Sequence, residues 1–262
     1  MLLLLLWACA SAPVGDLVEV GPVEAVAEGE GLTLSRQTWS DRGSSGFVYR
    51  ARLDRAARYE VRAADAVAPF SALTPPCEDP WVAINGGFYE GGKPMGLVVH
   101  EGKELSPLSD RGGSGVLFAG PAGLDISPRE AWTPGPTEAL QSIDRLVDGG
   151  KNLVQPNPDK AARAAIAIVG DAVEFILAFD SKSLSAPTGP IKLKETSNNG
   201  LALNRFADYL VQEVKADKAI NLDGGVSAQM TVCLGHLNRV AIQGERGTIN
   251  SVVGHRKLKY AE

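Results

Sequence analysis

The sequence has few of the residues and patterns on which several large classes of protein depend. It contains three cysteines and three histidines, without a CxxC pair and without a zinc-ligand spacing, so thiol redox chemistry and a zinc site are not expected. The glycine-rich phosphate loop of nucleotide-binding enzymes and the GxSxG turn of serine hydrolases are also missing. A calcium site of Asp and backbone oxygens stays open, although no EF-hand spacing occurs. We therefore expect no metal and no cofactor.

Positive charge is scarce and scattered. The chain has 26 Lys and Arg residues against 31 Asp and Glu residues, which gives a formal net charge of -5. Proteins that bind nucleic acids gather basic residues into stripes that neutralise phosphates, so no nucleic-acid partner is expected. With 44% hydrophobic and 22% charged residues, the composition is typical of a soluble globular protein.

Long apolar runs are absent as well. The leucines at residues 2–6 are too few to cross a bilayer, which takes about 20 apolar residues. Met1–Ala12 instead resembles an export signal. Leu6-Trp7-Ala8-Cys9 is similar to the lipobox of bacterial lipoproteins, so we expect a lipid on Cys9. The protein would then sit in the periplasm or on the outer surface of the envelope, touching the membrane only through that lipid; soluble secretion is the alternative.

Residues 13–31 lack periodicity, and we expect them to form a flexible tether. If Cys9 is lipidated, Cys77 and Cys233 remain. An even pair in an oxidising compartment favours a disulfide, and two buried free thiols are the alternative.

From residue 32 to 262 the pattern predicts one folded domain rich in strands. Helical spacing of apolar residues occurs over 137–147 and 201–214. Alternation, or short apolar runs between turn residues, predicts strands over 32–38, 47–53, 59–63, 81–84, 96–100, 115–119, 164–169, 173–179, 219–222, 229–233 and 237–242. Because no βαβ rhythm appears, the fold class is α+β: a single sheet-rich domain with few helices packed on mostly antiparallel β structure.

Two of the expected strands end in a polar residue and paired glycines, at Asn85 and at Asp223, and a third begins with Arg163. Paired glycines let the backbone approach a ligand, and successive N–H groups there can bind an anion. Arginine is the natural bidentate partner of phosphate. Taken singly, each motif is more often a tight turn. Taken together, they suit a site for a phosphorylated sugar.

The order of these motifs resembles the phosphodiester glycosidase family. NGGFY at 85–89, Pro-Met-Gly at 94–96, RAAIAI at 163–168 and AINLDGGVSAQM at 219–230 follow one another in the chain. The best-known type of member removes N-acetylglucosamine from the phosphodiester that masks mannose 6-phosphate, and bacterial relatives are commonly exported. The resemblance, from about Val48 to Gly254, implies hydrolysis of a sugar-1-phosphate diester in an envelope or extracellular polysaccharide.

The resemblance also implies roles for single residues. Arg163 would neutralise the phosphate, Asn85 would orient phosphate or sugar hydroxyls, and Asp223 would be the catalytic carboxylate. Glycosidases normally use two carboxylates; Asp148, which also precedes paired glycines, is our candidate for the second, and a helix-ending turn is its alternative. Because a phosphate leaving group is stable as an anion, Arg163 could replace the general acid. The expected substrate contacts are Gly86, Gly87, Phe88, Met95, Gly96, Gly224, Gly225 and Ser227.

Three positions differ from the family pattern. Val226 stands where a glycine is usual, Ala228 where Ser or Thr is usual, and Ala164 where Thr is usual. The missing hydroxyls would remove hydrogen bonds to the sugar or phosphate. The departures at Val226 and Ala228 motivate an alternative function, a non-catalytic lipoprotein that binds envelope polysaccharide on the same fold. A second alternative is a phosphodiesterase that cuts the P–O bond, with Arg163 and Asp223 holding a metal–phosphate unit.

Overall fold

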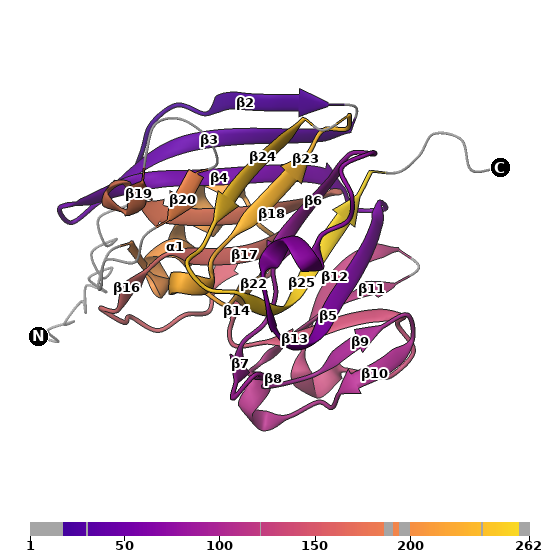
Figure 1. Ribbon diagram of the computed structural model, residues 1–262. Coiled ribbons are helices and arrows are strands. Elements are labelled where there is room, and N and C mark those ends of the chain that lie inside the picture. Colours follow the sequence, from indigo (N-terminus) through magenta and orange to yellow (C-terminus); the bar gives the residue numbers. More distant parts are fainter. Residues whose placement is uncertain are drawn as a thin grey trace, which may run out of the picture.

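The computed structural model describes residues 18–29, 31–120, 122–185, 191–193, 200–236 and 238–256. Most of these residues lie in strands, and the strands form three large sheets (Figure 1). The first sheet has nine strands, in the order β1 (Glu19–Val20), β3 (Leu32–Asp41), β4 (Ser44–Asp54), β18 (Ala172–Asp180), β17 (Arg163–Val169), β22 (Lys218–Leu222), β14 (Arg145–Asp148) and β15 (Lys151–Asn152), with β2 (Glu24–Gly29) also paired to β3.

The second sheet has seven strands, in the order β19 (Leu184–Ser185), β20 (Ile191–Leu193), β24 (Arg239–Gln243), β23 (Met230–Cys233), β6 (Trp81–Asn85), β25 (Thr248–His255) and β5 (Arg58–Ala68). The third has five: β10 (Lys103–Ser106), β9 (Val98–His100), β13 (Glu138–Ser142), β11 (Gly115–Gly120) and β12 (Gly123–Pro128). Two short pairs complete the set, β7 (Tyr89–Glu90) with β8 (Lys93–Pro94), and β16 (Lys160–Ala161) with β21 (Leu201–Ala202). Among the described strands, only β20 and β24 pair in parallel.

Helical structure is scarce in the described residues. Helix α1 (Leu203–Tyr209) continues into a π-helical turn (Leu210–Val214). Short 3₁₀ turns occur at Phe70–Leu73, Asp110–Gly112, Arg129–Ala131, Ser181–Ser183 and Gly225–Ser227. No helix of the described part is long and apolar enough to cross a membrane.

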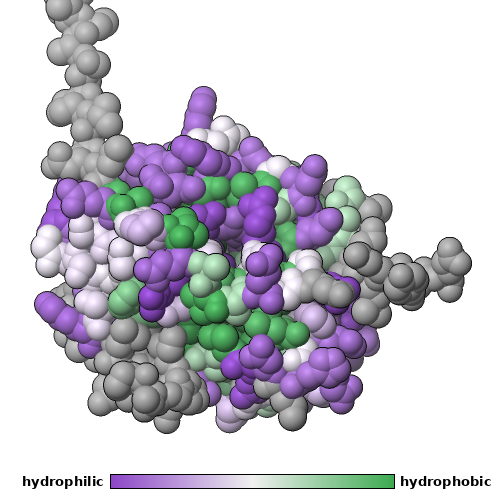
Figure 2. Space-filling model, turned by 90° about the horizontal axis from the view of Figure 1, so that it is seen from above, coloured by the Kyte–Doolittle hydropathy of each residue, from purple (hydrophilic) through white to green (hydrophobic). Residues whose placement is uncertain are grey.

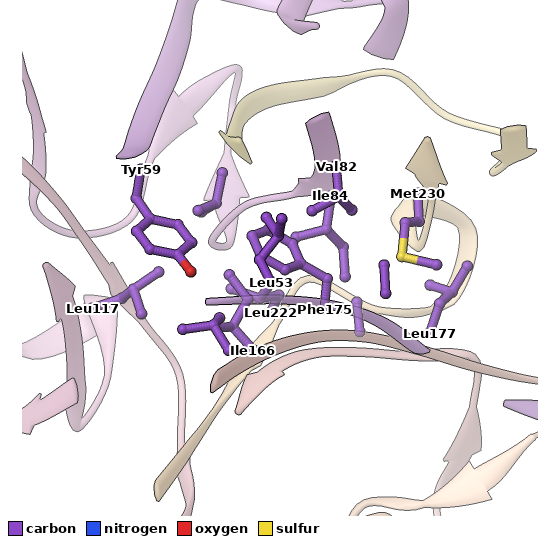
Figure 3. Close-up of a cluster of buried hydrophobic side chains, with 14 of the residues drawn as sticks. Leu53, Tyr59, Val82, Ile84, Leu117, Ile166, Phe175, Leu177, Leu222 and Met230 are labelled. Atoms are coloured by element: carbon purple, nitrogen blue, oxygen red, sulfur yellow. The ribbon is translucent and has the colours of Figure 1, made fainter. Parts of the chain in front are cut away.

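The first sheet is covered on both faces. One face packs against the second and third sheets and forms the main core, part of which Figure 3 shows. The other face packs against α1 and its π turn, and this second cluster contains Phe206 and Leu210. Because side chains alternate along a strand, Ile220 and Leu222 of β22 face the main core, whereas Ala219 faces the helix.

The fold class is confirmed in its main features: the chain is sheet-rich, its sheets are mostly antiparallel and the described helices are few. The strands predicted over 164–169 and 173–179 are present and pair as a hairpin, β17 with β18. The buried strands β6 and β22 and the helix predicted over 201–214 are present as well. The predicted disulfide between Cys77 and Cys233 is present as well.

The helix predicted over 137–147 is wrong, because β13 and β14 occupy this segment. A bulge between Arg145 and Val147 explains the misleading pattern. It places the consecutive residues Leu146 and Val147 in the same cluster, beside α1, whereas Leu140 lies in the main core. Two strands with a bulge therefore imitate helical spacing.

The flexible tether predicted for residues 13–31 also needs correction. Residues 18–29 contain β1 and β2, which both pair with β3. No apolar alternation marks this strand, because β2 lies at the border of the sheet and most of its residues are exposed. The ordered domain thus begins by Val18 instead of Leu32, while the expected signal segment 1–12, with Cys9, lies outside the described residues.

Large apolar side chains reach the surface only in places. The exposed large apolar side chains among the described residues come from several separate segments. They are Val23, Val26, Val67, Leu105, Leu108 and Leu153. In the view from above, apolar patches lie among hydrophilic residues (Figure 2).

Candidate active site

Strand ends from two sheets meet at one place. On the first sheet, Arg163 begins β17 and Asp223 directly follows β22. The last paired residues of β17 and β22 at this end are Ala164 and Leu222. One residue further out, Arg163 and Asp223 are opposite each other along the backbone, and the N–H of Gly225 then donates to the carbonyl of Ala162 at 2.8 Å. The N–H of Asp223 donates to the carbonyl of Gly86, after β6 of the second sheet, at 3.0 Å. The fold therefore brings the three predicted motifs together.

Asn85 fastens the loop that carries Asp223. Its side chain is fully buried, at 0% exposure. Its Nδ2 donates to the carbonyl of Asp223 at 2.6 Å and its Oδ1 accepts from the N–H of Gln229 at 3.0 Å. Backbone groups thus occupy both ends of this amide, and Asn85 fixes the position of the loop that carries Asp223.

The carboxyl group of Asp223 is unusually weak as an acid. Burial raises its pKa to about 6, against an ordinary value of 3.8. Hydrogen bonds from Ser227 and from the N–H of Gly224 oppose this rise, as does the positive charge of Arg246. A carboxyl group with a pKa near the operating pH is suited to general acid–base chemistry.

Arg163 is held by backbone carbonyls. Its Nε donates to Leu201 at 2.8 Å and its Nη2 to Asp159 at 2.6 Å. Burial lowers its pKa, and the charges of Asp159 and Asp144 oppose that effect; arginine nevertheless stays charged in proteins. No described residue accepts a hydrogen bond from Nη1, so one edge of an oriented guanidinium is available to a phosphate oxygen.

The structure does not bring Asp148 to this site. Strand β14 runs antiparallel to β22, and Asp148 pairs with Lys218, at the opposite end of β22 from Asp223. Its carboxylate forms an ion pair with Arg145 at 2.7 Å, and its side chain is 45% exposed. The facing pair of Asp148 and Asp223 that the sequence suggested is therefore not formed.

Asp144, and not Asp148, lies near Arg163. It lies in the turn between β13 and β14, with a left-handed φ of 65°, a conformation that Asp tolerates better than most residues. Its carbonyl accepts from the N–H of Asn221 at 3.0 Å, which ties it to the end of β22. Burial raises the pKa of Asp144, and Arg163 opposes the rise. The helical spacing of 137–147 conceals Asp144 in the sequence; the signal for it is an Asp at the break between two apolar stretches.

The paired glycines do not form the anion-binding loop that we expected. The N–H of Gly86 donates to the carbonyl of Asn250 at 2.9 Å, and that of Gly225 is also bound to a carbonyl. The N–H of Gly224 donates to the carboxylate of Asp223. Of the four, only Gly87 keeps an N–H without a partner among the described residues.

Packing explains why two of these positions are glycine. A Cβ on Gly86 would lie 2.0 Å from Oδ1 of Asn250, and one on Gly87 would lie 2.6 Å from the carbonyl oxygen of Gln141. Asn250 is 1% exposed, and neither its Nδ2 nor its Oδ1 has a partner in the described structure. Gly86 therefore gives room to a buried amide beside the site.

The other expected substrate contacts divide into two groups. Gly96 is buried, and a Cβ there would meet Oε1 of Gln141 at 2.5 Å, so it serves packing. Ser227 is buried and bonded to the Asp223 carboxylate. Phe88 and Met95 close the β7–β8 hairpin through a 3.0 Å backbone hydrogen bond. Both are half-buried, so they remain available to a substrate.

Two departures from the family pattern lie in the core. Ala164 and Ala228 are both 0% exposed and belong to the main core. A hydroxyl at either position would face apolar side chains, so its loss removes no contact with a bound sugar. Val226 is half-buried, and its carbonyl accepts from the N–H of Arg246 at 3.1 Å.

Among the described residues, no three His, Cys, Asp or Glu side chains gather as a metal site would require. The charged groups described at the candidate site are the carboxyl groups of Asp144 and Asp223 and the guanidinium groups of Arg163 and Arg246.

Two solved structures have a similar fold. A hypothetical protein from Synechocystis has a similar structure, with a TM-score of 0.59 and 15% identity over 90% of this chain and 64% of that chain. The catalytic domain of zebrafish N-acetylglucosamine-1-phosphodiester alpha-N-acetylglucosaminidase, auto-inhibited by its pro-peptide, gives 0.57 and 15% over 94% of this chain and 86% of that one. At such identity these structures share the fold.

No curated protein matches the chain. The model of one sequence family, however, matches residues 79–254, more than half of the chain. On that match, the chain belongs to the phosphodiester glycosidase family.

Proposed function

We propose that the protein is an exported hydrolase that cleaves the glycosidic C–O bond of a sugar-1-phosphate diester in an envelope or extracellular polysaccharide. Family membership supports a function of the phosphodiester glycosidase kind. The observation that best supports the finer proposal is a carboxyl group with a pKa of about 6, Asp223, at the end of β22 beside the strand that begins with Arg163, whose charge acts on Asp144.

Arg163 and Asp223 act on opposite sides of the scissile bond in this proposal. The free edge of Arg163 binds the phosphate and neutralises the charge that grows on it as the C–O bond breaks. Asp223 is mostly a carboxylate at neutral pH, since its pKa is about 6. It attacks the anomeric carbon or takes a proton from the attacking water. The balanced reaction adds water across the bond: free sugar leaves with the hydroxyl group, and the phosphate monoester keeps the bridging oxygen.

Asp144 is the second carboxyl group of the reaction. Its pKa is raised by burial and held down by Arg163. When an anionic phosphate binds Arg163, it offsets that positive charge, so the pKa of Asp144 rises further, which favours its protonated form. Asp144 then donates this proton to the departing oxygen. Two carboxyl groups with different environments can thereby divide the acid and base roles.

Export is part of the same proposal. A lipid on Cys9 would hold the protein at the periplasmic or outer face of the envelope, where extracellular polysaccharide is available. The disulfide between Cys77 and Cys233 supports an oxidising compartment.

The test is hydrolysis of UDP-N-acetylglucosamine and of simple α-sugar-1-phosphodiesters by the purified protein, beside Asp223→Asn, with and without EDTA. We expect release of free sugar that is lost in Asp223→Asn and unaffected by EDTA. Release of sugar phosphate, suppressed by EDTA, would instead indicate the metal-dependent phosphodiesterase. Binding of polysaccharide without turnover would indicate the non-catalytic lipoprotein.

A further inference from the structure

A hollow lies at the turn between β3 and β4. Its volume is about 560 Å³, and residues 40–45 form its wall together with Glu19 of β1. The turn begins with Arg42, whose φ of 46° is left-handed. Because β3 and β4 are paired as far as Asp41 and Ser44, the hollow lies at the outer end of both strands.

The hollow and Arg163 lie at the same end and on the same face of the first sheet. Arg163 pairs with Ala178 of β18, and Ala178 pairs with Val48 of β4, so β17 and β4 run in the same direction and both begin at this end. Ala165 and Val48 pack in the cluster beside α1. Since side chains alternate along a strand, Arg163 and Ser44 belong to the α1 face as well.

The segment before β17 joins the hollow to Arg163. Nη2 of Arg163 donates to the carbonyl of Asp159 at 2.6 Å. The next residue, Lys160, donates from Nζ to Oγ of Ser44 in the wall of the hollow at 2.7 Å. Figure 1 shows this arrangement, with β16 and α1 beside the hairpin of β3 and β4. One short segment therefore contacts both the guanidinium and the hollow.

The strand order places Arg163 between Asp223 and the hollow. Strand β17 has β22 on one side and β18, followed by β4, on the other. Val48 is level with Arg163 two strands away, and Ser44 is four residues further out, which corresponds to roughly 16 Å between the backbones of Arg163 and Ser44. With the cleaved sugar at Asp223 and the phosphate at Arg163, a leaving group longer than one sugar is needed to reach the hollow.

The lining of the hollow suits an uncharged sugar. Its polar groups are the hydroxyls of Ser40, Ser44 and Ser45, the carboxylate of Glu19 and the guanidinium of Arg42. Arg42 is exposed, and its guanidinium has no ion pair or hydrogen bond within the described part of the chain. Asp41 is buried and paired with Arg205 at 3.0 Å. Because charges of both signs line the hollow, a charged ligand would meet a like charge, whereas sugar hydroxyls can both donate and accept.

We propose that this hollow is a distal subsite for the leaving group, and that it binds a neutral sugar of the glycan attached to the scissile phosphate. The inference rests on the proposed function, because the position of the phosphate at Arg163 sets the direction in which the leaving group extends. The preferred substrate is then a diester whose phosphate carries an oligosaccharide of neutral sugars, in place of a single sugar or a small alcohol.

The test compares three α-glucosyl-1-phosphodiesters whose leaving alcohols are methanol, glucose and maltotriose, each sugar being linked through a terminal O6. We expect kcat/KM for the maltotriose diester to exceed that for the other two roughly tenfold. Arg42→Asn removes the guanidinium and keeps the turn, since Asn tolerates a left-handed φ, and it should remove most of this preference.

Lys215→Asn is the matched control. Lys215 is also an exposed cationic residue with a left-handed φ, of 60°. It precedes β22 and so lies at the opposite end of that strand from Asp223. The same substitution there removes a positive charge far from the hollow, and the preference for the maltotriose diester should be kept.

Two results would overturn the subsite and leave the proposed function standing: equal kcat/KM for the glucose and maltotriose diesters, or a preference that Arg42→Asn leaves intact. If no diester is hydrolysed, the proposed function fails, and calorimetric titration decides the hollow. Maltotriose phosphorylated on the same O6 should then bind roughly tenfold more tightly than glucose 6-phosphate, and Arg42→Asn should weaken it. Equal binding of the two phosphates, or binding indifferent to Arg42→Asn, rejects the subsite.

Discussion

At the scale of single residues, the central feature is a carboxyl group that the fold makes costly to ionise. Asp223 is partly removed from water, and its pKa rises to about 6 in spite of two hydrogen bonds and a nearby arginine. A residue with a purely structural role is rarely placed where its charge is disfavoured. Catalytic residues often are, because function needs a reactive group more than a stable one.

The pKa of Asp223 predicts how stability depends on pH. Because its folded pKa of about 6 lies above the ordinary 3.8, the group favours the folded state below pH 4, and this contribution is lost as pH rises through 6. The difference corresponds to at most about 3 kcal/mol. Asp223→Asn should therefore be more stable than wild type at pH 7.5, by roughly 1–3 kcal/mol in urea unfolding, but not at pH 4. Lower stability of the variant at pH 7.5 would contradict the burial argument.

Asp144 and Asp148 are the two candidates for the second catalytic carboxylate, and the same substitution in each compares them directly. Asn also tolerates the left-handed φ at residue 144, so Asp144→Asn removes the charge and leaves the turn. We expect kcat to fall by about 100-fold or more. Asp148→Asn loses one exposed ion pair with Arg145, worth about 0–1 kcal/mol, and should keep its kcat. The reverse ranking in steady-state assays would restore Asp148 as the catalytic group.

At the scale of elements, periodicity predicted the strands and α1 because their buried faces are regular. It failed at 137–147, where a bulge and the turn at Asp144 shift the side-chain alternation. It also failed at β2, whose exposed residues give no apolar signal. These local irregularities depend on neighbouring strands that pair from elsewhere in the chain, so the segment's own sequence does not reveal them.

The loop after β6 illustrates a glycine required by packing. We expect Gly86→Ala to lower the free energy of unfolding by about 1–3 kcal/mol, because its Cβ would lie 2.0 Å from Oδ1 of the buried Asn250. Gly120→Ala is the control, since its Cβ would have no contact shorter than 3.7 Å, and it should change stability by less than about 0.5 kcal/mol. Equal effects in thermal or urea unfolding would show that the loop yields easily.

At the scale of the whole molecule, the site depends on long-range pairing. The motifs of Arg163, Asp223 and Asn85 were visible in the sequence, and so was the chemistry they suit. Their convergence depends on the pairing of β17 with β22 and on the contact between the first and second sheets. Asp144 is placed by the hydrogen bond from the N–H of Asn221 to its carbonyl, and Arg246 by the bond from its N–H to the carbonyl of Val226; neither belongs to a motif of its own.

The disulfide stabilises the fold at a distance from the chemistry. Cys233 pairs with Trp81, at the end of β6 opposite Asn85, and the crosslink spans 156 residues. Replacing Cys77 and Cys233 with Ser should cost about 2–5 kcal/mol of stability and leave kcat near the wild-type value at 25 °C. A calorimetric scan and an assay of the same sample check both halves, and loss of kcat in a folded variant would contradict the separation.

The most direct test of the account follows the oxygen of water. Hydrolysis of an α-sugar-1-phosphodiester in ¹⁸O-labelled water distinguishes the two bonds that can break. Cleavage of the C–O bond by attack at the anomeric carbon places the label in the free sugar and leaves the phosphate monoester unlabelled, as the roles of Arg163, Asp144 and Asp223 predict. Label in the phosphate product would mean attack on phosphorus, and it would contradict the glycosidase assignment.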